Sequence, residues 1–219
     1  LKIREDAGDL YSTAKEYHHL GMVAQKQRQF DVAVDYYNKA LKIREDAGDL
    51  YSTAKEYHHL GMVAQKQRQF DVAVDYYNKA LKIFEDAGDL YSAASGYHQL
   101  GMVAQEQRQF DVAIKYYQKA WEVFEQFCDW RKASSTLRLW GEVIETQENC
   151  SEALQIYIRV LAIDLEHNED WISLDIYALA RMLKQLGESQ FQAIWREATG
   201  EECAAEIGEV IWTARDELS

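Results

Sequence analysis

The 219-residue sequence contains no proline, only three cysteines and no long apolar run. Because proline ends or kinks helices, its absence allows long helices. Cys128, Cys150 and Cys203 are scattered and odd in number, which excludes a disulfide framework and a closely spaced metal or redox pair. We expect them to be thiols that fill small apolar sites. A membrane-spanning helix needs about 18 or more consecutive apolar residues, so none is expected.

Positive charge is also scarce. The 24 lysines and arginines face 37 aspartates and glutamates, and the net charge is −13. The acidic excess gathers in residues 161–219, whereas residues 1–40 and 41–80 are each neutral. Nucleic acids and anionic membrane surfaces attract basic proteins, so neither is an expected partner. No signal peptide opens the sequence, and the expected location is the cytoplasm.

Motifs of catalysis and cofactor binding are missing as well. The sequence has no glycine-rich phosphate loop, no HExxH pair and no nucleophile elbow. Neighbouring histidines such as His18 and His19 point about 100° apart on a helix, so one pair cannot chelate a metal. Ligation would require His18, His58 and His98 to converge across separate segments. We therefore expect no enzyme activity, no cofactor and no metal site.

What the sequence does contain is a repeat. Residues 1–40 recur unchanged as residues 41–80, and residues 81–120 keep most of them. Residues 121–160 keep only the skeleton, with Leu137, Gly141, Ala153 and Tyr157 where Tyr17, Gly21, Ala33 and Tyr37 stand in the first copy. A fixed period of this size indicates stacked supersecondary units that touch mainly their neighbours. The expected fold class is all-α.

Each unit reads as two helices, near 10–28 and 31–47. Gly8 can end the preceding helix and Asp9 can cap the next one. Helical spacing places one face of each helix in the core. The residues expected on these faces are Leu10, Ala14, Tyr17, Leu20, Gly21 and Ala24 on the first helix, and Phe30, Ala33, Val34, Tyr37, Ala40 and Leu41 on the second. Small Gly21 and Ala33 would allow close approach, and large Tyr17, Phe30 and Tyr37 would fill the space.

The same reading continues along the chain. Helix pairs are expected near 50–68 and 71–87, 90–108 and 111–127, and 130–147 and 151–166, followed by helices near 171–186, 189–198 and 201–217. We assign residues 1–160 to the repeat array and residues 161–219 to a degenerate final unit with capping helices. Acidic Glu201, Glu202, Glu206, Glu209, Asp216 and Glu217 suit a solvated cap. Because Leu1 stands inside an expected second helix, we expect a fragment of a longer protein.

The order Tyr17, Leu20, Gly21, Ala24, Phe30, Ala33, Tyr37 and Ala40 resembles the tetratricopeptide repeat. That family's usual period is 34 residues with a closing proline, whereas this period is 40 and proline is absent. The longer unit is similar to the subclass in bacterial STAND-type signalling ATPases, CHAT proteins and the adaptor LGN. The resemblance implies a right-handed α-solenoid of stacked antiparallel helix pairs that binds a protein or peptide.

In that family the first helix of each pair lines the concave side. The resemblance therefore implies a partner-binding face made of residues that recur every 40 positions: Tyr11, Lys15, His18, Met22, Gln25, Tyr51, Lys55, His58, Met62, Gln65, Tyr91, His98, Met102, Gln105, Arg138, Glu142 and Glu145. This face is basic near Lys26 and Lys66 and acidic near Glu106, Glu142 and Glu145. A partner with one acidic and one basic end would dock in a single direction.

Three functions are compatible with the sequence. The first is a sensor or adaptor module, the C-terminal part of a larger bacterial signalling protein that captures a protein or peptide. The second is a self-assembly scaffold that associates end to end through the truncated N-terminus. The third is an engineered array, in which the duplicated unit has no natural ligand.

Overall fold

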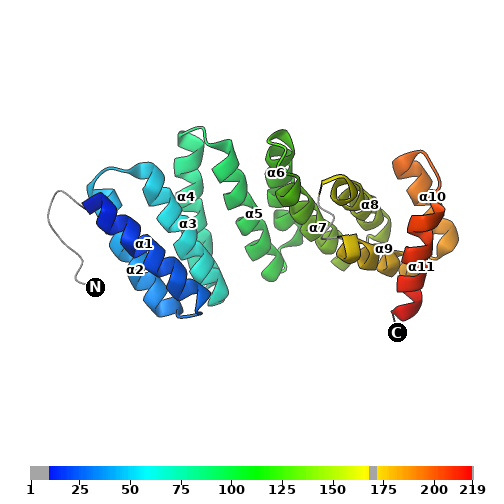
Figure 1. Cartoon of the computed structure of the whole chain (residues 1–219), viewed down its shortest axis with the longest axis horizontal. Coiled ribbons are helices and arrows are strands. Elements are labelled where there is room, and N and C mark those ends of the chain that lie inside the picture. The colour runs from blue at the N-terminus through cyan, green and yellow to red at the C-terminus, as the bar shows by residue number, and fades with distance from the viewer. Residues whose placement is uncertain (1–9, 168–171, 219) are drawn as a thin grey trace. The chain divides into compact units, whose positions relative to one another are not determined.

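The computed structural model describes residues 10–167 and 172–218, and the regular elements in this part of the chain are all helices. Within these two ranges helix follows helix without a strand, which confirms the all-α class (Figure 1). The helices are α1 (Leu10–Lys26), α2 (Phe30–Asp46), α3 (Leu50–Lys66), α4 (Phe70–Asp86), α5 (Leu90–Glu106), α6 (Phe110–Gln126), α7 (Trp130–Thr146), α8 (Cys150–His167), α9 (Ile172–Leu186), α10 (Glu188–Thr199) and α11 (Ala205–Glu217).

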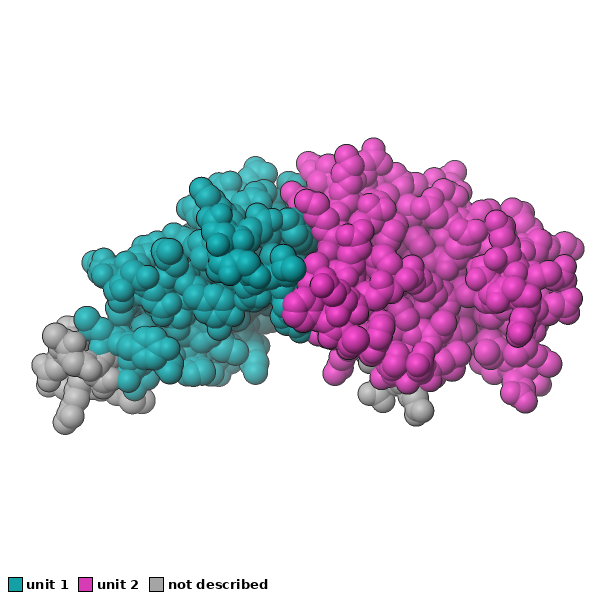
Figure 2. Space-filling view, turned by 90° about the horizontal axis from the view of Figure 1, so that it is seen from above, with its two compact units in different colours: residues 1–107 teal, residues 108–219 magenta. Residues whose placement is uncertain are grey.

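The chain forms two compact units, residues 1–107 and residues 108–219 (Figure 2). In the first unit α1 to α5 pack consecutively, and in the second α6 to α9 do so, with α10 and α11 packed on α8 and α9. This division by packing does not follow the division by sequence period, 1–160 and 161–219, which stays a prediction. Consecutive packing of neighbours is what a stack of helical hairpins requires.

Short turns between successive 40-residue repeats end one helix and cap the next, as the Gly-Asp sequence predicts. Gly48 and Gly88 have φ of +69° and +71°, the left-handed conformation that glycine adopts without strain. The Asp49 and Asp89 side chains then accept hydrogen bonds from the backbone N–H of Ser52 and Ser92. Gly8 and Asp9, from which the sequence analysis made this prediction for the first repeat, lie outside the described residues.

Several predicted bounds need correction. The first helix ends two residues early in each of the first three pairs, because Arg28, Arg68 and Arg108 take φ near +60° and turn the chain. The last helix begins at Ala205 and not at Glu201, since Gly200 ends α10 in the left-handed conformation and residues 201–204 connect the two helices.

The core repeats with the sequence. Tyr37, Tyr77, Tyr117 and Tyr157 are all essentially inaccessible to solvent, and Ala33 and its equivalents are equally buried. Gly21 lies so close to Tyr37 that a Cβ atom built on it would stand 2.7 Å from the ring, which confirms the close approach predicted there. Leu10 was wrongly assigned to the packing face, because it is 45% exposed and its equivalents Leu50 and Leu90 are also exposed.

Gly61 and Gly96 provide a matched pair of tests for this packing. A Cβ on Gly61 would lie 2.7 Å from the buried Tyr77 ring, whereas one on Gly96 would meet only Leu81 at 3.7 Å. We expect Gly61→Ala to destabilise the protein by about 1–3 kcal/mol through overpacking. Gly96→Ala should stabilise it by up to about 1 kcal/mol, because alanine favours a helix interior. Urea unfolding followed by circular dichroism measures both, and changes of the same sign would contradict this packing.

The prediction that the cysteines fill small apolar sites is wrong for Cys128. Cys128 does not fill an apolar site: it is exposed and occupies the left-handed turn position of Gly48 and Gly88, with φ of +55°. Trp121, Trp130 and Trp140 are near one another in sequence but do not form one cluster. Trp121 and Trp140 have ring centroids 6.5 Å apart, while Trp130 stacks on His167 at 4.7 Å.

The described residues contain no candidate membrane-spanning helix. None of their helices combines the length and the apolar composition that a bilayer crossing requires.

Candidate functional site

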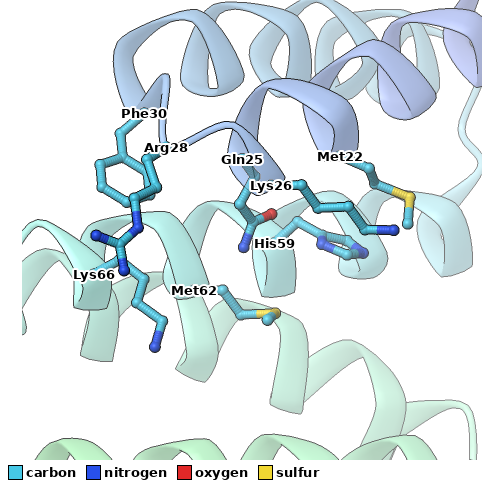
Figure 3. Close-up of a pocket in the computed structure, with 8 residues that line it drawn as sticks. All are labelled: Met22, Gln25, Lys26, Arg28, Phe30, His59, Met62 and Lys66. Carbon is cyan, nitrogen blue, oxygen red and sulfur yellow. The ribbon is translucent and has the colours of Figure 1, made fainter.

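A cavity with a volume of about 560 Å³ lies in the first unit. Met22, Gln25 and Lys26 reach it from α1, and His59, Met62 and Lys66 reach it from α3 (Figure 3). Arg28, in the turn before α2, and Phe30, the first residue of α2, complete its lining. Thioethers and an aromatic ring offer deformable apolar contact area, so this cavity suits an apolar side chain of a partner.

Positive charge surrounds this cavity. Lys26, Arg28 and Lys66 are exposed, and none of the three forms an ion pair with a residue that the structure describes. The charge is negative one repeat further on, because Glu106 stands at the position equivalent to Lys26 and Lys66. Glu106 accepts a hydrogen bond from Gln65 Nε2 at 3.1 Å and lies 3.9 Å from the Arg68 guanidinium. Within the first unit, a cavity with a basic rim is therefore followed by an acidic position.

Glutamines on the inner side of these helices are held by core tyrosines. Tyr37 Oη donates to Gln25 Oε1 at 2.7 Å, and Tyr77 Oη donates to Gln65 Oε1 at 2.9 Å. The bonds fix the direction of both amides and satisfy two tyrosine hydroxyls that lie against the core. Gln25 can still present its amide N–H groups to the cavity, whereas Gln65 is only 7% exposed and already donates to Glu106.

A buried ionic cluster lies behind the cavity wall. The Glu56 carboxylate is fully buried and contacts the Arg44 guanidinium and, at 2.8 Å, His18 Nδ1. Arg44 also donates to the backbone carbonyl of Ser52 at 3.0 Å. His18, assigned to the partner-binding face by sequence, thus has one ring nitrogen engaged in the core. The cluster joins α1, α2 and α3 and positions the helices that line the cavity.

His59 connects this cluster to the cavity. Its ring stacks on Tyr37 with centroids 5.2 Å apart and meets His18 edge to face at 4.9 Å. Burial, and then the nearby charges of His18, His58 and Arg44, lower the pKa of His59 from 6.5 to about 3. The imidazole is therefore neutral in the folded protein at physiological pH, and it forms part of the apolar wall.

His59 is expected to make the first unit sensitive to acid. The folded state holds this pKa below its unfolded value, so the stabilisation is complete above about pH 6.5 and is lost as pH falls toward 3. Between about pH 7 and pH 5 the loss amounts to about 2 kcal/mol. His59→Phe should remove this part of the acid sensitivity when urea unfolding is measured at both pH values. His19→Phe, the same sequence position on the exposed side of α1, should leave it unchanged.

In the second unit, two charged residues that the sequence placed on the partner-binding face form ion pairs within the protein. Arg138, aligned with His18, is mostly buried and pairs with Asp164 and Asp175, each at 2.7 Å. Glu145 accepts two hydrogen bonds from the Arg181 guanidinium at 3.0 Å and one from Tyr157 at 2.7 Å. The charges of Arg138 and Glu145 are thus engaged within the protein, and Glu142 is half-buried.

The other residues predicted on the partner-binding face belong to the first unit and do not line this cavity. Lys15 and Lys55 lie over the Tyr11 and Tyr51 rings at 4.4 Å. His58 and Lys55 line a smaller cavity of about 180 Å³, together with Ser92 and Ser95. Tyr91, His98, Met102 and Gln105 are half-buried on α5.

The cavity brings together Met22, Gln25 and Met62 from the predicted face, together with the lysines noted beside it. Sequence reasoning missed Arg28, Phe30 and His59. Phe30 had been assigned to packing alone. Arg28 comes into the site because it turns the chain in a left-handed conformation, which no glycine signals in the sequence.

The sequence matches one known repeat family over most of its length. The tetratricopeptide repeat family matches residues 7–86 and 92–166, most of the chain. The chain belongs to the tetratricopeptide repeat family. Among the positions that carried the resemblance, Gly21 lies against Tyr37 and Ala33 is fully buried. Leu20, predicted on the packing face, is instead 37% exposed on α1, whereas its equivalent Leu60 is buried.

Solved structures with the same tetratricopeptide-like architecture are distant in sequence. BtubC from P. vanneervenii matches with a TM-score of 0.74 at 20% identity, over 94% of this chain and 82% of that one. A putative kinesin light chain from Podosopora anserina gives 0.69 at 16%, over 94% and 97%. The Rap conjugation gene regulator of plasmid pLS20, solved in complex with a peptide, gives 0.65 at 15%, over 99% and 57%. At these identities the likeness concerns the fold.

A comparison of this chain with curated proteins found no match. In the described ranges, no group of three or more histidine, cysteine, aspartate or glutamate side chains is arranged to hold a metal ion.

Proposed function

We infer that this chain is a protein- or peptide-binding module, and that the cavity between α1 and α3 receives an apolar side chain of the partner. The observation that carries this proposal is the wall of Met22, Met62, Phe30 and neutral His59 beneath a rim of three cations. The peptide in the Rap complex supports it by showing that one protein of similar fold binds a peptide.

Charge defines which segments this site would favour. The Lys26, Arg28 and Lys66 rim attracts carboxylates next to the inserted side chain, while Glu106 further along the unit disfavours them. The partner segment would thus carry its acidic residues at the α1 end. From the sequence pattern, the larger setting that we propose is the sensor or adaptor part of a cytoplasmic bacterial signalling protein.

Selection from a random peptide display library on the whole chain tests this function. The selected peptides should be rich in aspartate or glutamate beside an apolar residue. Met22→Glu combined with Met62→Glu should weaken their binding at least about tenfold by calorimetry, because it puts two charges into the apolar wall. Val72→Glu, at an exposed position on α4 outside the cavity, is the matched control. Equal affinity for all three proteins would reject the site.

A further inference from the structure

A second cavity of the first unit, with a volume of about 280 Å³, lies where α3 begins and α4 ends. Leu50 and Tyr51 line it from α3, and Ile83, Asp86 and Ala87 line it from the last turn of α4 and the residue that follows. Leu50 is 65% exposed and Tyr51 is 42% exposed, so apolar surface is open to a partner here. None of these five residues lines the cavity of the proposed function, and the two sites are therefore separate.

Asp86 gives this apolar cavity a negative charge. Its side chain is exposed and pairs with no cation among the residues that the structure describes. The neighbouring Glu85 accepts a hydrogen bond from the Tyr97 hydroxyl and is already engaged. The last turn of α4 contains no basic residue, although the carboxyl end of a helix favours cations. A positive group from a partner would supply the charge that this helix end lacks.

The pair α7 and α8 fills the equivalent place with its own side chains. Trp130 begins α7 as Leu50 begins α3. His167 stands at the position of Ala87, and its ring stacks on Trp130 with centroids 4.7 Å apart and planes 6° apart. Glu166 replaces the aspartate of α4, and its carboxylate lies 3.6 Å from His167 Nε2. A flat ring with nitrogen donors thus packs on the residue that begins one helix, beside the carboxylate that ends the other. Ala87 offers only a methyl group, so the equivalent space between α3 and α4 is open.

We propose that the cavity between α3 and α4 binds an arginine side chain of a partner protein. The guanidinium is flat and bears N–H donors, as the His167 imidazole does, and it stays positively charged at neutral pH. It packs on Leu50 and Tyr51 and donates to the Asp86 carboxylate, a strong charge-assisted pairing. The methylene groups of its stem lie against Ile83. Lysine carries a compact, strongly hydrated charge without a plane that stacks, so it fits this cavity less well.

Tyr51 is held in place for this contact. Its hydroxyl donates to Asp89 Oδ2 at 3.0 Å, and its ring meets the buried Phe84 ring edge to face with centroids 5.8 Å apart. Lys55 Nζ lies 4.4 Å from the centroid of the Tyr51 ring, so this ring already accepts one cation from the chain itself. Because Lys55 brings its own positive charge close, the Asp86 carboxylate decides whether a second cation binds.

The probe is the tripeptide acetyl-Gly-Arg-Gly-amide, added near neutral pH to the full chain with labelled leucine, isoleucine and alanine methyl groups. NMR should show saturable shifts of the Leu50, Ile83 and Ala87 methyl signals, with a dissociation constant in the millimolar range that one side chain supports. Peptides with lysine or neutral citrulline in place of arginine should bind more weakly, the citrulline peptide by at least about tenfold. Asp86→Asn should weaken binding of the arginine peptide by a similar factor. Asp75→Asn, which removes the same charge from an exposed position of α4, should leave the affinity unchanged.

Filling the cavity from within the chain gives an independent test. Leu50→Trp with Ala87→His copies the α7–α8 pair, so it should abolish the peptide-dependent shift at Ile83. The pair α1 and α2 has the same lining residues at positions 10, 11, 43, 46 and 47, and the two pairs are read from separate signals. Undiminished shifts in the double variant, equal affinity for the three peptides, equal effects of Asp86→Asn and Asp75→Asn, or no saturable shift at about 50 mM peptide would each overturn the proposal.

Discussion

Replacing Glu56 by alanine should lower the free energy of unfolding by about 3–5 kcal/mol, the cost of breaking a buried ion pair by removing one partner. Glu56 is fully buried against Arg44, which is only 6% exposed, and Arg44 Nε already lacks a hydrogen-bond partner. Without the carboxylate, a buried guanidinium would keep one backbone carbonyl as its acceptor. Urea unfolding followed by far-ultraviolet circular dichroism measures the loss.

The repeated sequence supplies the control and the rescue for this prediction. Glu16→Ala changes the same residue in the same local sequence, but Glu16 is exposed, so a change below about 1 kcal/mol is expected. Arg44→Phe with Glu56→Gly copies the next interface of the chain, where Phe84 and Gly96 stand at these positions. That double variant should recover most of the lost stability. Equal losses for Glu56→Ala and Glu16→Ala would mean that the cluster contributes nothing specific.

Arg138→Met should destabilise the second unit by a similar amount, about 3–5 kcal/mol near neutral pH. Arg138 is the cation shared by Asp164 and Asp175, whose side chains are 0% and 1% exposed. Its removal would leave two buried carboxylates facing each other. All six tryptophans, at positions 121, 130, 140, 171, 195 and 212, belong to this unit, so tryptophan fluorescence during urea unfolding reports on it selectively.

The pH dependence gives this second prediction a signature. Burial raises the pKa of Asp175 to about 6, even though its hydrogen bond from Arg138 lowers it. A raised folded pKa means that Asp175 contributes most stability at low pH and loses that contribution as pH rises through about 6. The penalty of Arg138→Met should therefore be smaller near pH 5 than near pH 7.5. Arg196→Met, which breaks the exposed pair with Glu202, should cost under about 1 kcal/mol at either pH.

Helix positions and core contacts could be predicted from the sequence because they depend on local signals. Gly48 and Asp49 end one helix and cap the next in the way that their chemistry predicts. The spacing of Gly21 and Tyr37 requires a close approach, and that approach is present. The helix ends at Arg28, Arg68 and Arg108 could not be predicted, since arginine rarely takes a left-handed conformation.

The candidate site was only partly predictable, and the repeat shows why. Glu16 and Glu56 have identical neighbours along the chain, yet one is exposed and the other is buried. Their difference arises from the helix packed against each, which no local sequence pattern encodes. For the same reason Arg138 and Glu145 looked like solvated groove residues, whereas Asp175 and Arg181 from the following helix engage them.

The cavity beside Met22 and Met62 is the most directly testable part of the proposed function. Hydrogen exchange should be measured on the whole chain with and without a library-selected peptide. Binding at this site predicts slower exchange in residues 20–30 and 58–67, the segments that contain the cavity lining. Protection confined to α9 and α11, where Ile172, Ile176 and Val210 line a second apolar cavity, would contradict it.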